Sequence, residues 1–197
     1  MSRIAIDCDG VLADFTQAFV HECNHLWPGR FPFDFEPTAW DALEGWGLTP
    51  TEEGLVWQRI KRTPNWWLTL NAMPGLSDLQ RWLISHAGHD IFVCTSRCSS
   101  LGATTTMQTH LWLQSCGLRG VNNFVGVITV PKSKHKCDVY QAMEIEWSLD
   151  DKPETVIDCG LIDTMEHHAW LLSQPWNAKA GVHNRTSSVQ EFLEKIA

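Results

Sequence analysis

From residue 74 onward, apolar stretches of strand length alternate with stretches of helix length, and this alternation constrains the fold more than any other feature of the sequence. Helices are expected over residues 76–86, 103–116, 136–144 and 187–196, and strands over residues 90–95, 124–130, 147–150 and 168–172. The run Ile4-Ala5-Ile6 predicts one more buried strand near the N-terminus. Strands that alternate with helices form a parallel sheet with helices on both faces, so the sequence predicts an α/β fold.

The segment between the first expected helix, residues 11–26, and residue 73 has a different character. Residues 27–72 contain six of the eleven Trp and five of the nine Pro. Short helices are expected near residues 38–44 and 50–62, the second of them beginning at Thr49-Pro50. We therefore expect a core formed by residues 1–15 and 73–197, with a small, mainly helical cap inserted at residues 16–72.

The bulk composition limits the partners of the chain. With 197 residues and a formal net charge of −8, the chain is a poor general binder of polymeric nucleic acid, whereas a small phosphorylated substrate is compatible with one local positive site. No apolar run approaches the roughly 18 residues of a membrane span, and no signal peptide precedes the first strand, so we expect a cytoplasmic protein. The seven Cys show no zinc-binding spacing and are interpreted as buried free thiols of a reducing compartment.

Polar residues follow several of the expected strands. Asp7 and Asp9 follow the first strand, Thr95-Ser96-Arg97 end the strand over residues 90–95, and Asp150-Asp151 end the strand over residues 147–150. Because functional sites of such sheets lie beyond the carboxyl ends of the strands, we expect these side chains to meet. Paired carboxylates repel one another unless a cation lies between them, and hard oxygen ligands suit Mg²⁺. The set matches what phosphoryl transfer to an aspartate requires.

In this order, the residues resemble the four motifs of the haloacid dehalogenase (HAD) superfamily of phosphatases. The motifs are Asp7 to Val11, Phe92 to Thr95, the helix that begins at Lys136, and Leu149 to Asp151. The resemblance implies a Rossmann-like three-layer core, a parallel sheet of strand order 5-4-1-2-3 and a cap inserted after the first motif. It also implies a phosphoric monoester hydrolase that uses Mg²⁺.

The resemblance assigns a role to each motif residue. Asp7 is the expected nucleophile, and Asp9 is the expected general acid and base. The expected metal ligands are Asp7, the backbone carbonyl of Asp9, Asp151 directly and Asp150 through water. Thr95, with Ser96 and Arg97 beside it, is expected to bind the phosphate. Lys136 is expected to neutralise Asp7 and the phosphate, with Lys132 and Lys134 as alternatives.

Within the superfamily, three stretches are similar to the 5′(3′)-deoxyribonucleotidases: Asp7 to Phe15, Asn65 to Gly75, and Cys94-Thr95-Ser96. The similarity implies a nucleobase held between aromatic rings, at positions matching Phe15, Trp66 and Trp67. The expected reaction is hydrolysis of a nucleoside monophosphate through an aspartyl phosphate. The sequence leaves open whether the protein forms a homodimer.

Other functions remain to be weighed. A HAD phosphatase for a sugar phosphate or for a polynucleotide end would share the same motifs, and a non-catalytic binding protein could keep the fold. The aromatic cap favours a flat substrate over a sugar, and the complete motif set favours turnover. His21-Glu22-Cys23-Asn24-His25 matches the zinc-protease pattern H-E-x-x-H, but we interpret it as part of a helix that packs on the sheet.

Overall fold

The computed structural model describes residues 2–39, 45–118, 124–161 and 167–196. Its centre is a six-stranded sheet of order β3-β2-β1-β4-β5-β6, in which every neighbouring pair is parallel. The strands are β1 (Arg3–Ile6), β2 (Asp90–Ser96), β3 (Phe124–Val130), β4 (Trp147–Asp150), β5 (His168–Leu172) and β6 (Arg185–Thr186). The expected α/β class and the order 5-4-1-2-3 are confirmed, with β6 added beside β5.

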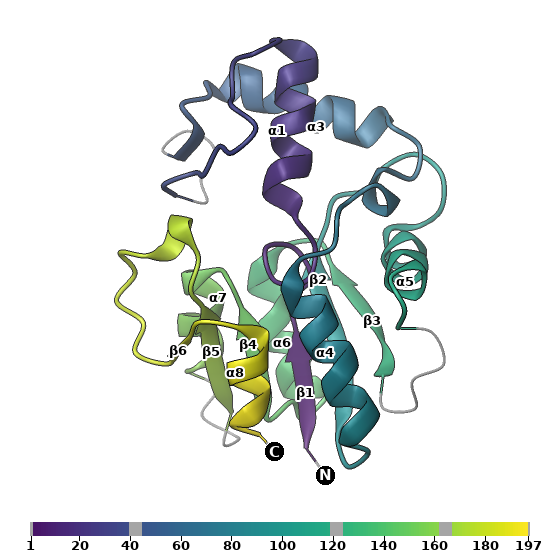
Figure 1. The fold of residues 1–197 in the computed structure, drawn as a ribbon, viewed down its shortest axis with the longest axis vertical. Helices are drawn as coiled ribbons and strands as arrows, with labels where there is room; N and C mark the ends of the chain where they lie inside the picture. The colour runs from purple at the N-terminus through teal and green to yellow at the C-terminus, as the bar shows by residue number, and fades with distance from the viewer. Residues whose placement is uncertain (1, 40–44, 119–123, 162–166, 197) are drawn as a thin grey trace.

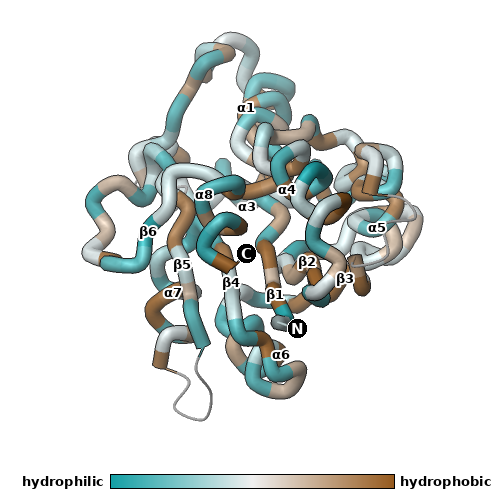
Figure 2. The backbone as a smooth tube through the Cα atoms, turned by 60° about the horizontal axis from the view of Figure 1, so that its bottom comes forward, coloured by the Kyte–Doolittle hydropathy of each residue, from teal (hydrophilic) through white to brown (hydrophobic). Residues whose placement is uncertain are grey.

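Helices cover both faces of the sheet and create two apolar clusters (Figure 1). On one face lie α4 (Pro74–Ser85), α5 (Thr105–Ser115) and α8 (Val189–Glu194), which pack on side chains such as Ile4, Ile6 and Val93. On the other face lie α6 (Lys136–Ala142) and α7 (Pro153–Cys159), which pack on Ala5 and Phe92. The central strands β1 and β2 are therefore buried on both sides, as their continuous apolar sequences require. Figure 2 shows the hydrophobic colours along β1, β2 and β5, inside the ring of helices.

Helices α1 (Phe15–Leu26) and α3 (Pro50–Arg62) and the 3₁₀ turn η1 (Trp66–Leu68) lie beyond the carboxyl ends of the strands (Figure 1). Helix α3 begins with a capping box, because Thr49 accepts from the Glu52 amide and Glu52 accepts from the Thr49 amide. The expected helix near residues 38–44 lies mostly outside the described residues. The division of the chain into a core and a cap stays a prediction.

The first helix begins four residues later than the sequence pattern predicts. The carbonyl of Cys8 accepts from the amides of Val11, Leu12 and Ala13, which folds this stretch into a tight turn instead of a helix. Gly10 has φ of +76°, and Asp14 caps α1 by accepting from the Gln17 amide at 3.0 Å. The apolar residues 11 and 12 are buried in this turn, so their spacing was misread as helical. The sequence pattern also missed α7, η2 (Ser133–His135) and η3 (Pro175–Asn177), which are all short.

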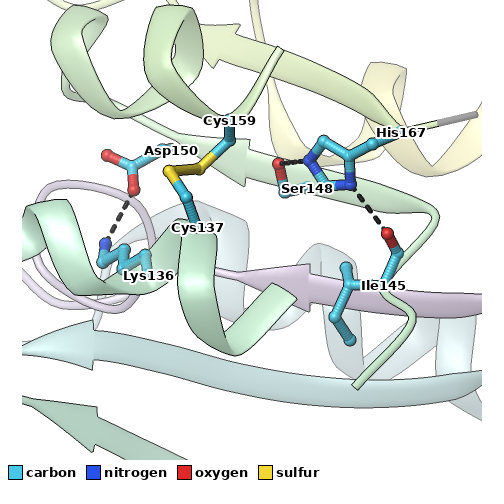
Figure 3. The surroundings of a disulfide bond; sticks show 7 residues. All are labelled: Lys136, Cys137, Ile145, Ser148, Asp150, Cys159 and His167. Carbon is cyan, nitrogen blue, oxygen red and sulfur yellow. Dashed lines mark hydrogen bonds and ion pairs between the residues drawn. A yellow bond between two sulfur atoms is a disulfide. The ribbon is translucent and has the colours of Figure 1, made fainter. Parts of the chain in front are cut away.

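The interpretation of all seven Cys as free thiols is wrong for two of them. Cys137 on α6 and Cys159 on α7 form a disulfide with Cα atoms 5.0 Å apart (Figure 3). The sequence offered no sign of this pairing, because 22 positions separate the two residues and only the docking of α6 against α7 brings them together. Cys8, Cys23 and Cys94 are buried free thiols, while Cys98 and Cys116 are partly exposed. Among the described residues, no helix is both long and apolar enough to cross a membrane.

Candidate active site

The turn after β1 places Asp7 and Asp9 at the carboxyl edge of the sheet. The Asp7 amide donates to the Leu149 carbonyl on β4 at 2.9 Å, and the Cys8 amide donates to Asp7 Oδ1 at 2.7 Å. A Cβ atom at Gly10 would collide with the carboxylate of Asp151. The glycine thus allows the turn to approach the acidic end of β4 closely.

Lys136 joins the carboxylates of β1 and β4. Its Nζ lies 2.7 Å from Asp150 Oδ2 (Figure 3) and 2.9 Å from Asp7 Oδ2. The side chain is almost fully buried at the start of α6. Burial alone would lower the pKa of Lys136, but the two carboxylates outweigh it and hold the pKa well above 10.5. The alternatives Lys132 and Lys134 are exposed. Of the three lysines, the structure places Lys136 against Asp7.

Arg97, which is expected beside the phosphate, binds Asp9 in this structure. Its Nε donates to Asp9 Oδ2 at 2.9 Å and its Nη2 to Asp9 Oδ1 at 2.6 Å, while Nη1 donates to Thr109 at 2.8 Å. The guanidinium also lies 4.6 Å from the centre of the Trp67 ring. Thr95 Oγ1 donates to Asp9 Oδ2 at 3.3 Å. With its side chain fully buried, Arg97 is a positioning group for Asp9 in this structure.

A stretch after β5 holds the fourth motif, and sequence reasoning missed it. Trp176 Nε1 donates to Asp151 Oδ2 at 2.9 Å, and Asn177 Nδ2 donates to the Asp151 carbonyl at 2.8 Å. Gln174 Nε2 donates to the Gly10 carbonyl at 2.7 Å. Strand 168–172 was expected, so the rule about carboxyl ends of strands could have pointed to residues 174–177.

Three buried carboxylates could hold a metal ion. Oxygens of Asp7, Asp150 and Asp151 lie within 4.8 Å of one another. Burial raises the pKa of Asp7 to about 7 despite Lys136, and burial together with Asp150 and Asp7 raises that of Asp151. Among the described residues around the site, four buried carboxylates face only two buried cations, Lys136 and Arg97. Because uncompensated buried charge is costly, this oxygen donor set fits a hard divalent cation.

A cavity of about 330 Å³ opens above these carboxylates and has two chemically distinct ends. The polar end is lined by Asp7, Asp9, Thr95, Ser96, Lys136, Asp150 and Asp151. The aromatic end is lined by Phe15, Phe19, Trp46, Trp57 and Trp67, together with the carboxylate of Glu53. The volume falls at the lower end of the range for small-molecule sites. A substrate with one anionic and one flat apolar part would match the two ends.

The aromatic residues expected to bind the substrate do not share one environment. Phe15 and Trp67 line the cavity, but Trp66 does not; it is 2% exposed and donates from Nε1 to Glu22 at 2.9 Å. The Phe15 ring lies nearly parallel to two neighbours, Trp57 at 5.9 Å and Trp67 at 6.2 Å between ring centres. These rings pack on one another, and the half-buried Trp57, which the sequence did not single out, is the most exposed of the three.

The glutamate and the two histidines of the H-E-x-x-H stretch lie in different environments. Glu22 is buried and accepts from Trp66 and from Arg59 of α3, while His21 and His25 are exposed on α1. Because the glutamate joins α1 to α3 and η1, its carboxylate serves packing. The stretch is part of a packed helix, as expected, but this helix packs on α3 and η1 and not on the sheet.

Solved structures with the same arrangement identify the class of fold. A HAD-superfamily hydrolase of Geobacter sulfurreducens is 15% identical to this chain and superposes with a TM-score of 0.59. The superposition covers 100% of this chain and 97% of the hydrolase. The L-2-haloacid dehalogenase of Xanthobacter autotrophicus is 14% identical, with 100% and 98% covered and a TM-score of 0.56. A D,D-heptose 1,7-bisphosphate phosphatase of Burkholderia thailandensis is 11% identical, with 100% and 98% covered and a TM-score of 0.52. The chain has the fold of the HAD superfamily hydrolases.

One curated relative carries a more specific name than the fold class does. A protein of Bordetella pertussis named putative 5′(3′)-deoxyribonucleotidase is 30% identical to this chain over 115 residues. The match covers 56% of this chain, and the chain spans only 58% of that relative's length. A search against models of protein families found no match.

Proposed function

We propose that the protein is a Mg²⁺-dependent phosphatase that hydrolyses nucleoside monophosphates through an aspartyl phosphate. The observation that carries the proposal is the cavity that joins the Asp7 carboxylate, held by Lys136, to a group of aromatic rings. The similarity to a relative named as a deoxyribonucleotidase supports the choice of a nucleotide. The HAD fold supports the hydrolytic chemistry.

Asp7 is the nucleophile in this proposal. One of its carboxylate oxygens attacks the phosphorus atom, and the bond between phosphorus and the ester oxygen breaks. Lys136 lies within 2.9 Å of Asp7, where its charge both orients the carboxylate and offsets the charge of the phosphoryl oxygens. Ser96 lines the same end of the cavity and supplies a hydroxyl donor for the phosphoryl group, and Thr95 supplies a second when its hydroxyl turns from Asp9 to the substrate.

Asp9 moves the protons. It gives a proton to the departing ester oxygen, and in the second step it takes a proton from the water that attacks the aspartyl phosphate. The products are inorganic phosphate, the free alcohol and the regenerated Asp7 carboxylate. Arg97 fixes the orientation of the Asp9 carboxyl group by donating to both of its oxygens.

Asp7, Asp151 and Asp150 are the side chains that would hold Mg²⁺, and Trp176 and Asn177 fix the Asp151 end of this set. The ion would supply positive charge beside the phosphoryl oxygens. The protein residues bind and orient the substrate, exclude water from the first step and carry the protons.

A substrate panel tests the proposal. Phosphate release by the purified chain is measured with the four deoxynucleoside monophosphates, two sugar phosphates and p-nitrophenyl phosphate, with Mg²⁺ and with excess EDTA. We expect the nucleotides to give the highest kcat/KM and EDTA to abolish all activity. Full activity in EDTA would contradict the mechanism, and a preference for sugar phosphates would contradict the substrate class.

A further inference from the structure

Glu53 is an acidic residue in a cavity that is proposed to bind an anion, and the proposed chemistry does not use it. It is half-buried on α3 and lines the aromatic end of the cavity. Its Oε1 accepts from the indole Nε1 of Trp57 at 3.0 Å, one helical turn further along α3. Among the described residues, no cation forms a salt bridge with Glu53. A carboxylate in this position offers hydrogen-bond acceptors and no donor.

The neighbouring Glu52 differs from Glu53 in where its carboxylate is used. Glu52 completes the capping box of α3 and forms a salt bridge with Arg30. Both of its interactions lie within the protein, and it does not line the cavity. Within the described part of the chain, the Glu53 carboxylate has a single protein partner and lines the substrate space, so Oε2 and a second lone pair of Oε1 remain for a ligand.

The ring geometry places a flat ligand beside this carboxylate. Insertion between two stacked rings would separate their centres to about 7 Å, twice the base-stacking rise of about 3.4 Å. The Phe15 ring lies only 5.9 Å from Trp57 and 6.2 Å from Trp67, so neither gap holds a base as the rings stand. A base therefore stacks on the outside of this group, where Trp57 is half-buried and its indole is fixed by Glu53.

We infer that Glu53 selects the base by accepting hydrogen bonds from its edge, and that the preferred base is guanine. Guanine presents two adjacent donors, the ring N1–H and the exocyclic amino group, which a carboxylate can accept together. Thymine presents one N–H between two carbonyl oxygens, which a carboxylate repels. Adenine and cytosine, with one amino group each, fall between the two. The inference rests on the proposed function for the position of the base in this cavity.

The matched variants are Glu53→Gln and Glu52→Gln, which remove the same charge from adjacent positions. In Glu53→Gln, the amide oxygen of the new side chain still accepts from Trp57, while its NH₂ group now meets the guanine donors. We expect the wild-type ratio of kcat/KM for dGMP over dTMP to exceed about ten, because a bidentate contact to a base discriminates by about that factor or more. Glu53→Gln should lower this ratio at least about tenfold, and Glu52→Gln should leave it unchanged.

Binding separates this inference from the proposed reaction. Calorimetry on Asp7→Asn with dGMP and with dTMP measures base preference without turnover, and Asp7→Asn combined with Glu53→Gln measures the share of Glu53. If binding shows a dGMP preference that depends on Glu53 but the wild-type protein hydrolyses no nucleotide, the inference is supported and the proposed function is rejected. Four outcomes would overturn the inference, whatever the activity toward p-nitrophenyl phosphate: equal affinities for dGMP and dTMP, a higher affinity for dTMP, no nucleotide binding, or a ratio of the two affinities that Glu53→Gln leaves unchanged.

Discussion

The two ends of the cavity are built in different ways. At the polar end, the charged groups come from the ends of β1, β2 and β4 and from the start of α6, and the protein itself supplies their partners: Lys136 for Asp7, Arg97 for Asp9 and Trp176 for Asp151. At the aromatic end, rings from α1, α3 and η1 pack mainly on one another. Directional contacts fix the chemistry at one end, whereas stacking at the other tolerates change. Substitutions at the polar end should therefore lower kcat, and those at the aromatic end should raise KM.

Removal of the nucleophile should have the largest effect. Asp7→Asn keeps the size of the side chain but removes the attacking charge, so we expect kcat to fall by at least about 10³-fold for every substrate. The variant should stay folded, because burial already disfavours the charged form of Asp7. Phosphate release and circular dichroism check the two expectations. An Asp7→Asn protein with more than a tenth of the normal rate would place the nucleophile elsewhere.

Lys136→Met should lower both kcat and stability. It leaves Asp7 and Asp150 buried without their cation, and the loss of one partner from a buried ion pair costs about 3–5 kcal/mol. We expect kcat to fall about 100-fold and thermal unfolding to occur at lower temperature, with Mg²⁺ restoring part of the stability. Lys132→Met, at an exposed lysine of the same segment, is the control. Equal losses in both variants would contradict the assignment of Lys136.

Arg97→Lys tests positioning at the polar end without removing the charge. Lysine cannot reproduce the two parallel bonds to Asp9, so proton transfer to the leaving group should suffer. We expect kcat to fall about tenfold or more for a nucleotide, whose alkoxide leaves poorly, and much less for p-nitrophenyl phosphate, which needs little proton donation. Arg59→Lys, at the ion pair with Glu22, is the control. An equal loss for both substrates would leave Arg97 with a purely structural role.

The same contrast explains what the sequence could predict. Asp7, Asp9, Thr95 and Asp150-Asp151 follow buried strands, and a parallel sheet brings strand ends together whatever the details of packing. The partner of Asp9 could not be predicted, because whether Arg97 turns toward a phosphate or toward a carboxylate depends on side-chain packing against Trp67 and Thr109. The environment of each aromatic ring could not be predicted from the sequence either. Trp66 and Trp67 are adjacent in sequence, yet one contacts Glu22 in the interior and the other lines the cavity.

The smallest effect is expected at the aromatic end, where Trp57 and Trp66 can be compared directly. Trp57→Ala removes the half-buried stacking surface, so KM for nucleotides should rise about tenfold, the usual worth of one base–aromatic stack, with little change in kcat. Trp66→Phe loses the bond to Glu22 and part of a buried ring that does not line the cavity, so it should lower the unfolding temperature and leave KM unchanged. Steady-state kinetics with a nucleotide and with p-nitrophenyl phosphate measure both. If Trp66→Phe raised KM and Trp57→Ala did not, the base would lie beside η1, and the stack on Trp57 would be wrong.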